Sequence, residues 1–167
     1  MSGSARRNVI IAAACAGLGV LGYGFWPREE THISDLLTEL CTQLNQTRDE
    51  ASLIRLQRFL NGKLQPGASV HLVELEQELL GRLDVVAHAR DLLSGPPLTF
   101  SLSSIEVRVS GRLARADADL TVTASGSGEQ RRELRRTRVR LAKLGDEWQI
   151  EAVEVDPIDP AQMEARP

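Results

Sequence analysis

The chain has 167 residues, a formal net charge of −3 and a hydrophobic content of 42%. Its length accommodates one membrane segment and one modest domain, and its hydrophobic content is too high for a wholly disordered chain. A charge near zero argues against a general nucleic-acid-binding protein, which usually carries a basic surplus. Two cysteines cannot form a disulfide scaffold.

The N-terminal region contains an apolar segment, residues 9–26, in which 18 consecutive residues carry no charge. As a helix it would span about 27 Å, close to the hydrocarbon core of about 30 Å. Two arginines precede it and three aromatic residues close it, as at a membrane interface. We therefore expect an uncleaved single-pass anchor in the cytoplasmic (inner) membrane. Residues 1–8 would lie in the cytoplasm, and the C-terminal domain in the periplasm or outside the cell.

Three other interpretations of this segment remain open. A cleaved signal peptide would need a small-x-small site after the apolar run, and the sequence there offers a poor one. A lipoprotein would be acylated at Cys15, after a very short apolar stretch. Arg6 and Arg7 weakly resemble a twin-arginine export signal. Ala13 and Gly17, four residues apart, would suit pairing of two anchors in a homo-oligomer.

Helical patterns follow the apolar segment. Apolar residues at helical spacing predict a first helix over 31–44. The residues 47–50 match a capping box and predict a second helix that ends at Asn61-Gly62. A third, longer helix is expected over 69–93, with a bend or break at Gly81. Its buried face would consist of Leu72, Leu75, Leu79, Leu83, Val86 and Leu93.

From residue 98 the pattern changes to a period of two, which is typical of strands. In the first expected strand, 98–109, the apolar residues change from even to odd positions. A bulge near Ser103-Ser104 would keep them on one face. The clearest strand, 114–124, alternates apolar and polar residues and is therefore expected to have one buried and one solvent-exposed face. Further strands over 136–141 and 148–155, joined by a glycine turn, complete an expected antiparallel meander of about four strands.

Helices followed by a curved antiparallel sheet indicate an α+β roll over residues 31–156, with a disordered tail over 157–167. The segment from Arg138 to Ile150, with its Gly-Asp turn and Trp-x-Ile strand, resembles the closing hairpin of nuclear transport factor 2-like (SnoaL-like) domains. The resemblance implies a cystatin-like roll in which helices cover the concave face of the sheet. Members of that family usually have a short strand between the second and third helices. None is visible here, so the third helix would replace it.

The resemblance implies that an enzyme of this type would place His, Asp, Glu or Tyr in the cone-shaped interior between the helices and the concave face of the sheet. Catalysis requires titratable groups that converge in a pocket. The residues expected to point inward include no ionisable group, and we therefore expect a non-catalytic domain without a cofactor. They are Phe100, Leu102, Ala114, Ala116, Ala118, Leu120, Val122, Val139, Leu141 and Ile150.

The other residues with chemical potential have ordinary explanations. His32, His71 and His88 are expected to be solvated and lack the close spacing of a zinc site. Cys41 lies on a helical stripe and is expected to be a small buried hydrophobe. A group of acidic residues is expected to form a solvent-exposed helix face; it comprises Glu74, Glu76 and Glu78.

Two features point to binding. The first is a one-sided basic strand, in which Arg136, Arg138 and Arg140 either pair with Asp117 and Asp119 on a neighbouring strand or dock onto an acidic partner or an anionic lipid surface. The second is a run of small residues that either admits a helix closely or leaves an apolar pocket. The pocket would be lined by Ala114, Ala116, Ala118, Phe100 and Trp148.

The sequence therefore favours a membrane-anchored interaction or assembly domain of a bacterial envelope complex, with protein partners and no nucleic acid. An apolar-ligand or lipid-binding domain and a SnoaL-like enzyme are the alternatives.

Overall fold

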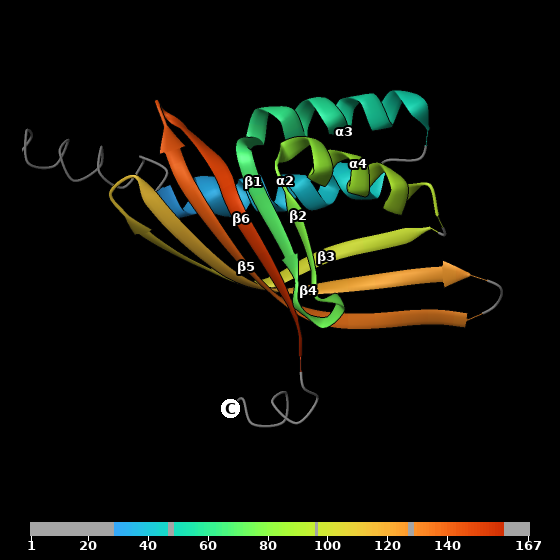
Figure 1. Cartoon of the computed structure of the whole chain (residues 1–167). Helices are drawn as coiled ribbons and strands as arrows, with labels where there is room; N and C mark the ends of the chain where they lie inside the picture. The colour runs from blue at the N-terminus through green and yellow to red at the C-terminus, as the bar shows by residue number, and fades with distance from the viewer. Residues whose placement is uncertain (1–28, 47–48, 96, 127–128, 159–167) are drawn as a thin grey trace, which may run out of the picture.

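The computed structural model describes residues 29–46, 49–95, 97–126 and 129–158. This part of the chain is an α+β fold, as the sequence indicates, with three helices packed on a curved, mixed sheet (Figure 1). The sheet has six strands, so the expectation of about four is wrong. The elements in chain order are α2 (Glu29–Gln46), α3 (Glu50–Lys63), β1 (Leu64–Leu72), the 3-10 turn η1 (Val73–Leu75), β2 (Gln77–Leu80), α4 (Arg82–Leu93), β3 (Leu98–Ser110), β4 (Leu113–Gly126), β5 (Glu129–Leu144) and β6 (Glu147–Pro157).

The sheet has the strand order β2-β1-β6-β5-β4-β3. Strands β3 to β6 form the predicted antiparallel meander. The predicted bulge is also present, because the register between β3 and β4 shifts between Ser103 and Glu106, and Ser104 has a φ of +53°. Strand β1 instead pairs in parallel with β6, which makes the sheet mixed.

The third helix is the main error of the sequence interpretation. The helix α4 begins only at Arg82, and the segment before it forms the hairpin of β1 and β2. Two of the leucines assigned to a buried helical face are exposed, Leu75 at 66% and Leu83 at 79%. The glycine at 81, with a φ of +87°, ends β2 and separates it from α4. The hairpin supplies the short strands that the family pattern contains.

The first two helices lie close to their expected positions. In α2, Ile33, Leu36 and Leu37 are buried, as the helical stripe predicts. The cap of α3 lies two residues later than expected: Asp49 is the N-cap, and its side chain accepts a hydrogen bond from the Ser52 backbone N–H at 2.8 Å. This hydrogen bond is also the main cause that lowers the pKa of Asp49.

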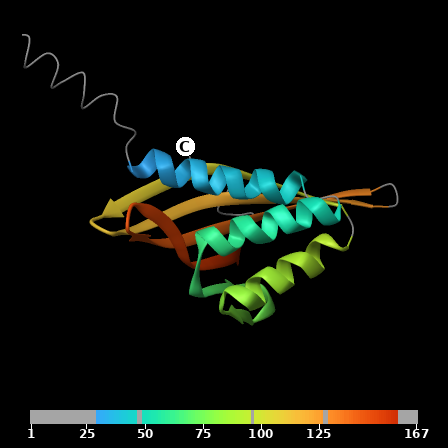
Figure 2. The same ribbon diagram turned by 90° about the horizontal axis from the view of Figure 1, so that it is seen from above.

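The three helices cover one face of the sheet (Figure 2), here called the helix-covered face. Its core combines helix residues such as Leu37 and Leu56 with strand residues such as Ala116, Val139 and Leu141, all at most 4% exposed. The opposite side of the same strands, here called the outer face, carries alternating polar residues. Each strand therefore contributes one half of its side chains to packing and the other half to the surface.

Two expectations fall on residues outside the described ranges. The apolar segment 9–26 and the tail over 159–167 lie there. Within the described residues, none of the helices has the length and apolar character needed to cross a membrane. At the other end, β6 continues through Pro157, which is the first residue of the expected tail.

Candidate functional site: the outer face of the sheet

The outer face carries a central stripe of arginines on β5 between two acidic stripes. Residues directly opposite each other on paired strands point to the same side of a sheet. Arg136 therefore lies between Asp119 of β4 and Asp156 of β6. One row further on, Arg138 is flanked in the same way; its neighbours are Asp117 and Glu154.

Arg138 is the centre of an ion-pair cluster in this stripe. Its guanidinium lies 2.8 Å from a carboxylate oxygen of Glu154 and also donates a hydrogen bond to Asp156. That hydrogen bond is the main cause that raises the pKa of Arg138. Asp117, which the sequence suggests as a partner of the arginines on β5, forms a 3.0 Å ion pair with Arg115 of its own strand. The acids of β6 therefore contribute most of the neutralisation of Arg138.

The other two arginines of the stripe are arranged differently. No ion pair within 4.0 Å joins Arg136 or Arg140 to an acidic side chain of the described residues. The two residues are four positions apart on one strand, which corresponds to about 13 Å. The outer face thus presents two cationic groups on either side of a neutralised one.

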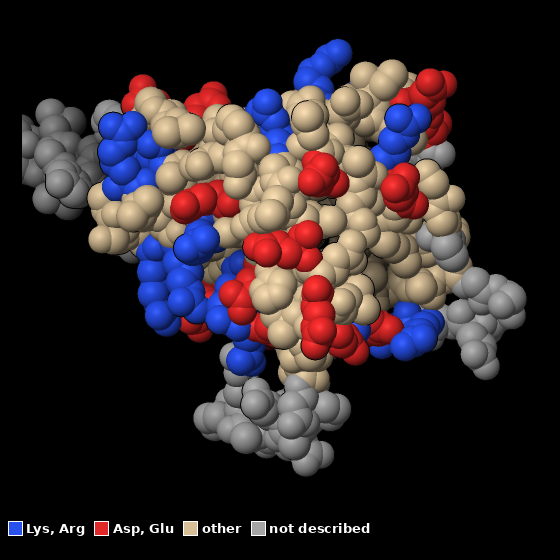
Figure 3. Space-filling model, viewed as in Figure 1, with Lys and Arg blue, Asp and Glu red and all other residues tan. Residues whose placement is uncertain are grey.

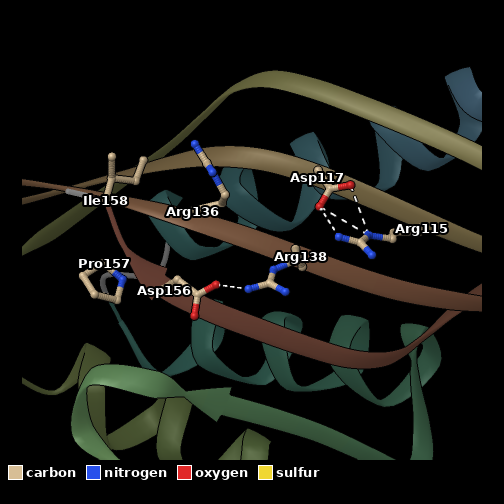
Figure 4. Close-up of a pocket in the computed structure, with 7 residues that line it drawn as sticks. All are labelled: Arg115, Asp117, Arg136, Arg138, Asp156, Pro157 and Ile158. Carbon is tan, nitrogen blue, oxygen red and sulfur yellow. Dashed lines mark hydrogen bonds and ion pairs between the residues drawn. The ribbon is translucent and has the colours of Figure 1, made fainter. Parts of the chain in front are cut away.

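Two adjacent hollows open on this face, and Figure 4 shows the residues that line the first. The first has a volume of about 370 Å³; in Figure 4, Arg136 projects beside the paired Arg138 and Asp156. The second, of about 320 Å³, shares Arg115 and Arg138 with the first and continues towards β1. The first hollow is lined by Arg115, Asp117, Arg136, Arg138, Asp156, Pro157 and Ile158, and the second also by Ser69, His71, Glu78, Arg140, Ala152, Val153 and Glu154.

The residues of the predicted apolar pocket lie in the interior. Phe100, Ala114, Ala116, Ala118 and Trp148 are all buried, with exposed fractions of at most 8%. Apolar side chains of α2 belong to the same core cluster as Ala114 and Ala116 of β4. None of the five lines either hollow of the outer face. The burial of these residues favours a closely packed helix over an open pocket.

The helix-covered face is less uniformly apolar than the sequence suggests. In the N-terminal half of β5, Arg135 and Glu133 share this face with Leu120 and Val122. Arg135 forms ion pairs of 2.9 Å with Glu74 and 2.7 Å with Glu133. Glu74 comes from η1, because the acidic residues expected on a helix belong to the β1–β2 hairpin. This charged trio lines neither hollow of the outer face.

Two titratable groups away from the outer-face cluster have shifted pKa values. Burial raises the pKa of the half-buried Cys41 thiol, whereas a hydrogen bond from Lys143 is the main cause that lowers the pKa of Glu29. His32 and His71 are exposed, as expected. Within the described residues, no group of three or more His, Cys, Asp or Glu side chains is arranged to hold a metal ion. The chemistry that the outer face offers is therefore charge recognition.

The sequence interpretation identified the arginine stripe but missed its context. Arg115, Glu154 and Asp156 complete the cluster. The signal for the acids was present, since Glu154 and Asp156 alternate with valine in the last strand. Their position beside the arginines follows from strand pairing, as does the position of His71 opposite Glu154 through the parallel pairing of β1 with β6.

Comparison with solved structures supports the fold. No protein-family model and no curated protein matches the sequence. An uncharacterised cystatin-like protein from Caulobacter vibrioides is 18% identical, with 81% of this chain and 93% of that chain covered and a TM-score of 0.64. A nuclear transport factor 2-like protein from Novosphingobium aromaticivorans is 18% identical, with 92% of this chain and 95% of that chain covered and a TM-score of 0.62. A nuclear transport factor 2-like protein of unknown function from Pseudomonas putida is 18% identical, with 80% of this chain and 89% of that chain covered and a TM-score of 0.60. The chain therefore has the nuclear transport factor 2-like, cystatin-like fold, as the closing hairpin suggests.

Proposed function

We propose that this chain is a membrane-anchored, non-catalytic interaction domain of a bacterial envelope complex, and that it binds a partner protein through the outer face of its sheet. The observation that carries the proposal is the arginine stripe, in which Arg136 and Arg140 flank the neutralised Arg138 above two adjacent hollows. The apolar segment 9–26 supports the envelope location.

The distribution of charge indicates the chemistry of the partner. Two arginines whose backbone positions are about 13 Å apart suit a protein surface with two carboxylates, because arginine forms bidentate pairs with carboxylates. Exposed charges of this kind accelerate association and select partners more than they add affinity. Binding is therefore expected to weaken as the ionic strength rises.

A second copy of this chain is one partner that meets this description. A two-fold axis between β5 and β6 would place the arginine stripe of one copy over the acidic stripe of the other, since such an interface uses the same patch twice. Light scattering of the detergent-solubilised full chain distinguishes a homo-oligomer from a monomer that needs a different protein.

The test is affinity purification of the full chain from solubilised membranes, with two matched charge reversals. Arg136→Glu with Arg140→Glu changes the outer face, and Arg55→Glu with Arg58→Glu makes the same change in net charge on exposed positions of α3. We expect the first pair to lose the partner and the second to retain it. Recovery of a monomeric wild-type chain alone, or equal recovery with both pairs, would contradict the proposal.

A further inference from the structure

One end of the domain gathers features that suit a membrane surface. The turns between β3 and β4 and between β5 and β6 lie at this end, as does the first residue of α2 (left in Figures 1 and 2). Glu29 fixes this arrangement: its carboxylate lies 2.5 Å from the Lys143 ammonium and accepts a hydrogen bond from the Trp148 indole N–H at 2.6 Å. The start of α2 is therefore attached to the end of the sheet that carries both turns.

The length of chain before α2 limits how far this end can be from the bilayer. The apolar segment ends at Trp26, three residues before Glu29. Even a fully extended chain spans only about 11 Å over that distance. If residues 9–26 are the anchor, the end of the domain that carries Glu29 lies at the membrane interface.

The same end exposes two leucines. Leu113 is 59% exposed and Leu144 is 50% exposed. Both lie on the outer face, where Leu113 is opposite Ala142 and Leu144 is two residues further along β5. They are thus diagonal neighbours, which in a sheet are about 7–8 Å apart. Arg112 joins the β3–β4 turn to the end of β5, because its side chain donates hydrogen bonds of 3.0 and 3.1 Å to the Lys143 carbonyl.

A row of arginines lies behind the leucines. Arg108, Arg115 and Arg140 are opposite one another on β3, β4 and β5, about 7 Å further along the strands than Leu113. Like charges directly opposite each other are destabilising in water. Acidic side chains offset part of this repulsion, with Glu106 at 3.6 Å from Arg108 and Asp117 at 3.0 Å from Arg115. Basic side chains gather at this end of the space-filling view (Figure 3).

The two leucines lie at the end of the domain and the arginine row lies about 7 Å further along the strands. This order matches the order of layers at a bilayer interface. There, apolar side chains enter the acyl boundary and basic groups meet the phosphates. The acids at this end are partly neutralised within the domain, since Glu29 pairs with Lys143 and Glu147 lies 3.5 Å from Lys63. Asp146, in the β5–β6 turn, opposes anionic lipid, so apolar contact carries the attachment and the arginines add to it.

We infer that this end of the domain rests on the phospholipid surface, with Leu113 and Leu144 inserted into the interface beside the anchor. The inference rests on the anchor of the proposed function and specifies how the domain is oriented. It also predicts that the outer face stands at a steep angle to the bilayer, with Arg136 further from the lipid than Arg140. A partner protein would then approach from the side.

The experiment places a polarity-sensitive fluorophore on single cysteines in the full chain, after replacement of Cys15 and Cys41. The chain is reconstituted in vesicles of phosphatidylethanolamine and phosphatidylglycerol that contain a quencher-labelled lipid. The probe positions are Leu113→Cys and Leu144→Cys. The matched control is Ser125→Cys, an exposed position at the other end of β4, about 40 Å from Leu113. A probe at Val20→Cys reports on the anchor itself.

We expect strong quenching at position 20 and several-fold stronger quenching at 113 and 144 than at 125. Arg108→Glu is expected to reduce the quenching at 113 and to leave position 20 unchanged. Quenching at 20 with positions 113 and 144 indistinguishable from 125 would overturn the inference and leave the anchor standing. Absence of quenching at 20 would refute the anchor of the proposed function and the inference with it.

Discussion

The two faces of β4 and β5 are built from alternate residues of the same strands, yet different forces determine them. On the helix-covered face, Ala116 and Leu141 are at most 1% exposed and pack against helices. On the outer face, Arg115 and Arg140 are exposed. Close packing makes the first face sensitive to the volume of each side chain. The second face is constrained mainly by charge, and it is therefore free to carry recognition without loss of the fold.

The largest expected effect tests this difference with neighbouring residues of β5. Leu141→Ala removes a fully buried side chain and is expected to lower the free energy of unfolding by about 2–5 kcal/mol. Arg140→Ala, on the outer face, is expected to change it by no more than about 0.5 kcal/mol. Chemical denaturation of the full chain in detergent measures both, and similar losses for the two variants would show that the outer face is also packed.

A second variant tests whether the alanines leave space. Ala116→Leu is expected to lower the free energy of unfolding by about 1–3 kcal/mol, because overpacking forces neighbouring side chains from their preferred rotamers. Asp117→Leu, the next residue on the outer face, serves as the control and is expected to cost less. A stable Ala116→Leu protein would support the alternative of an apolar pocket beneath α2.

A third variant concerns a polar contact on the covered side. The Asn45 side chain of α2 donates a hydrogen bond to the Phe100 carbonyl and accepts one from the Phe100 N–H, both at 2.7 Å. It thereby satisfies the backbone N–H and C=O of Phe100 on β3, which is the last strand of the sheet. Asn45→Ala is expected to cost about 1–3 kcal/mol because it leaves backbone groups unpaired.

The neighbouring exposed residue provides the control for Asn45. Gln46→Ala is expected to leave the unfolding midpoint in urea nearly unchanged. Loss of one outer-face ion pair, as in Glu154→Gln, is expected to cost less than Asn45→Ala, because exposed pairs contribute only about 0–1 kcal/mol. The reverse order would mean that the outer face contributes more to stability than its exposure indicates.

The smallest expected effect is the pH dependence of the Glu29 contact. Hydrogen bonds from Lys143 and Trp148 lower the pKa of Glu29 below its ordinary value of 4.5. Stabilisation from a lowered pKa is present above the ordinary value and is lost as the pH falls through the folded value. Thermal unfolding of Glu29→Gln is therefore expected to occur at a slightly lower temperature than that of wild type at neutral pH.

This difference should shrink below pH 4.5, as the wild-type carboxyl also becomes neutral. The adjacent exposed residue offers a matched comparison, and Glu30→Gln is expected to show no such pH-dependent difference. A gap between wild type and Glu29→Gln that persists in acid would exclude the carboxylate charge as its source.

Part of this architecture could be predicted from the chain alone. The stripe of α2, the bulge near Ser103 and the meander of β3 to β6 all reflect local periodicity, which is visible without a structure. The β1–β2 hairpin could not be predicted in this way. Its leucines occur at spacings that fit a helix, and only pairing with β6, about 80 residues later, selects the strand.

The candidate site also has one part that could be predicted from the chain alone and one part that could not. Alternation within one strand was enough to place Arg136, Arg138 and Arg140 on a common face, because successive strand residues point to opposite sides. The pairing of Arg138 with β6, the hollows and the row that includes Arg108 depend on register between strands. Register is a property of the assembled sheet, since it is set by packing and bulges as well as by local pattern. The sequence by itself determined the fold class and the sidedness of strands β3 to β6, and the tertiary structure decided the β1–β2 hairpin and which charges meet.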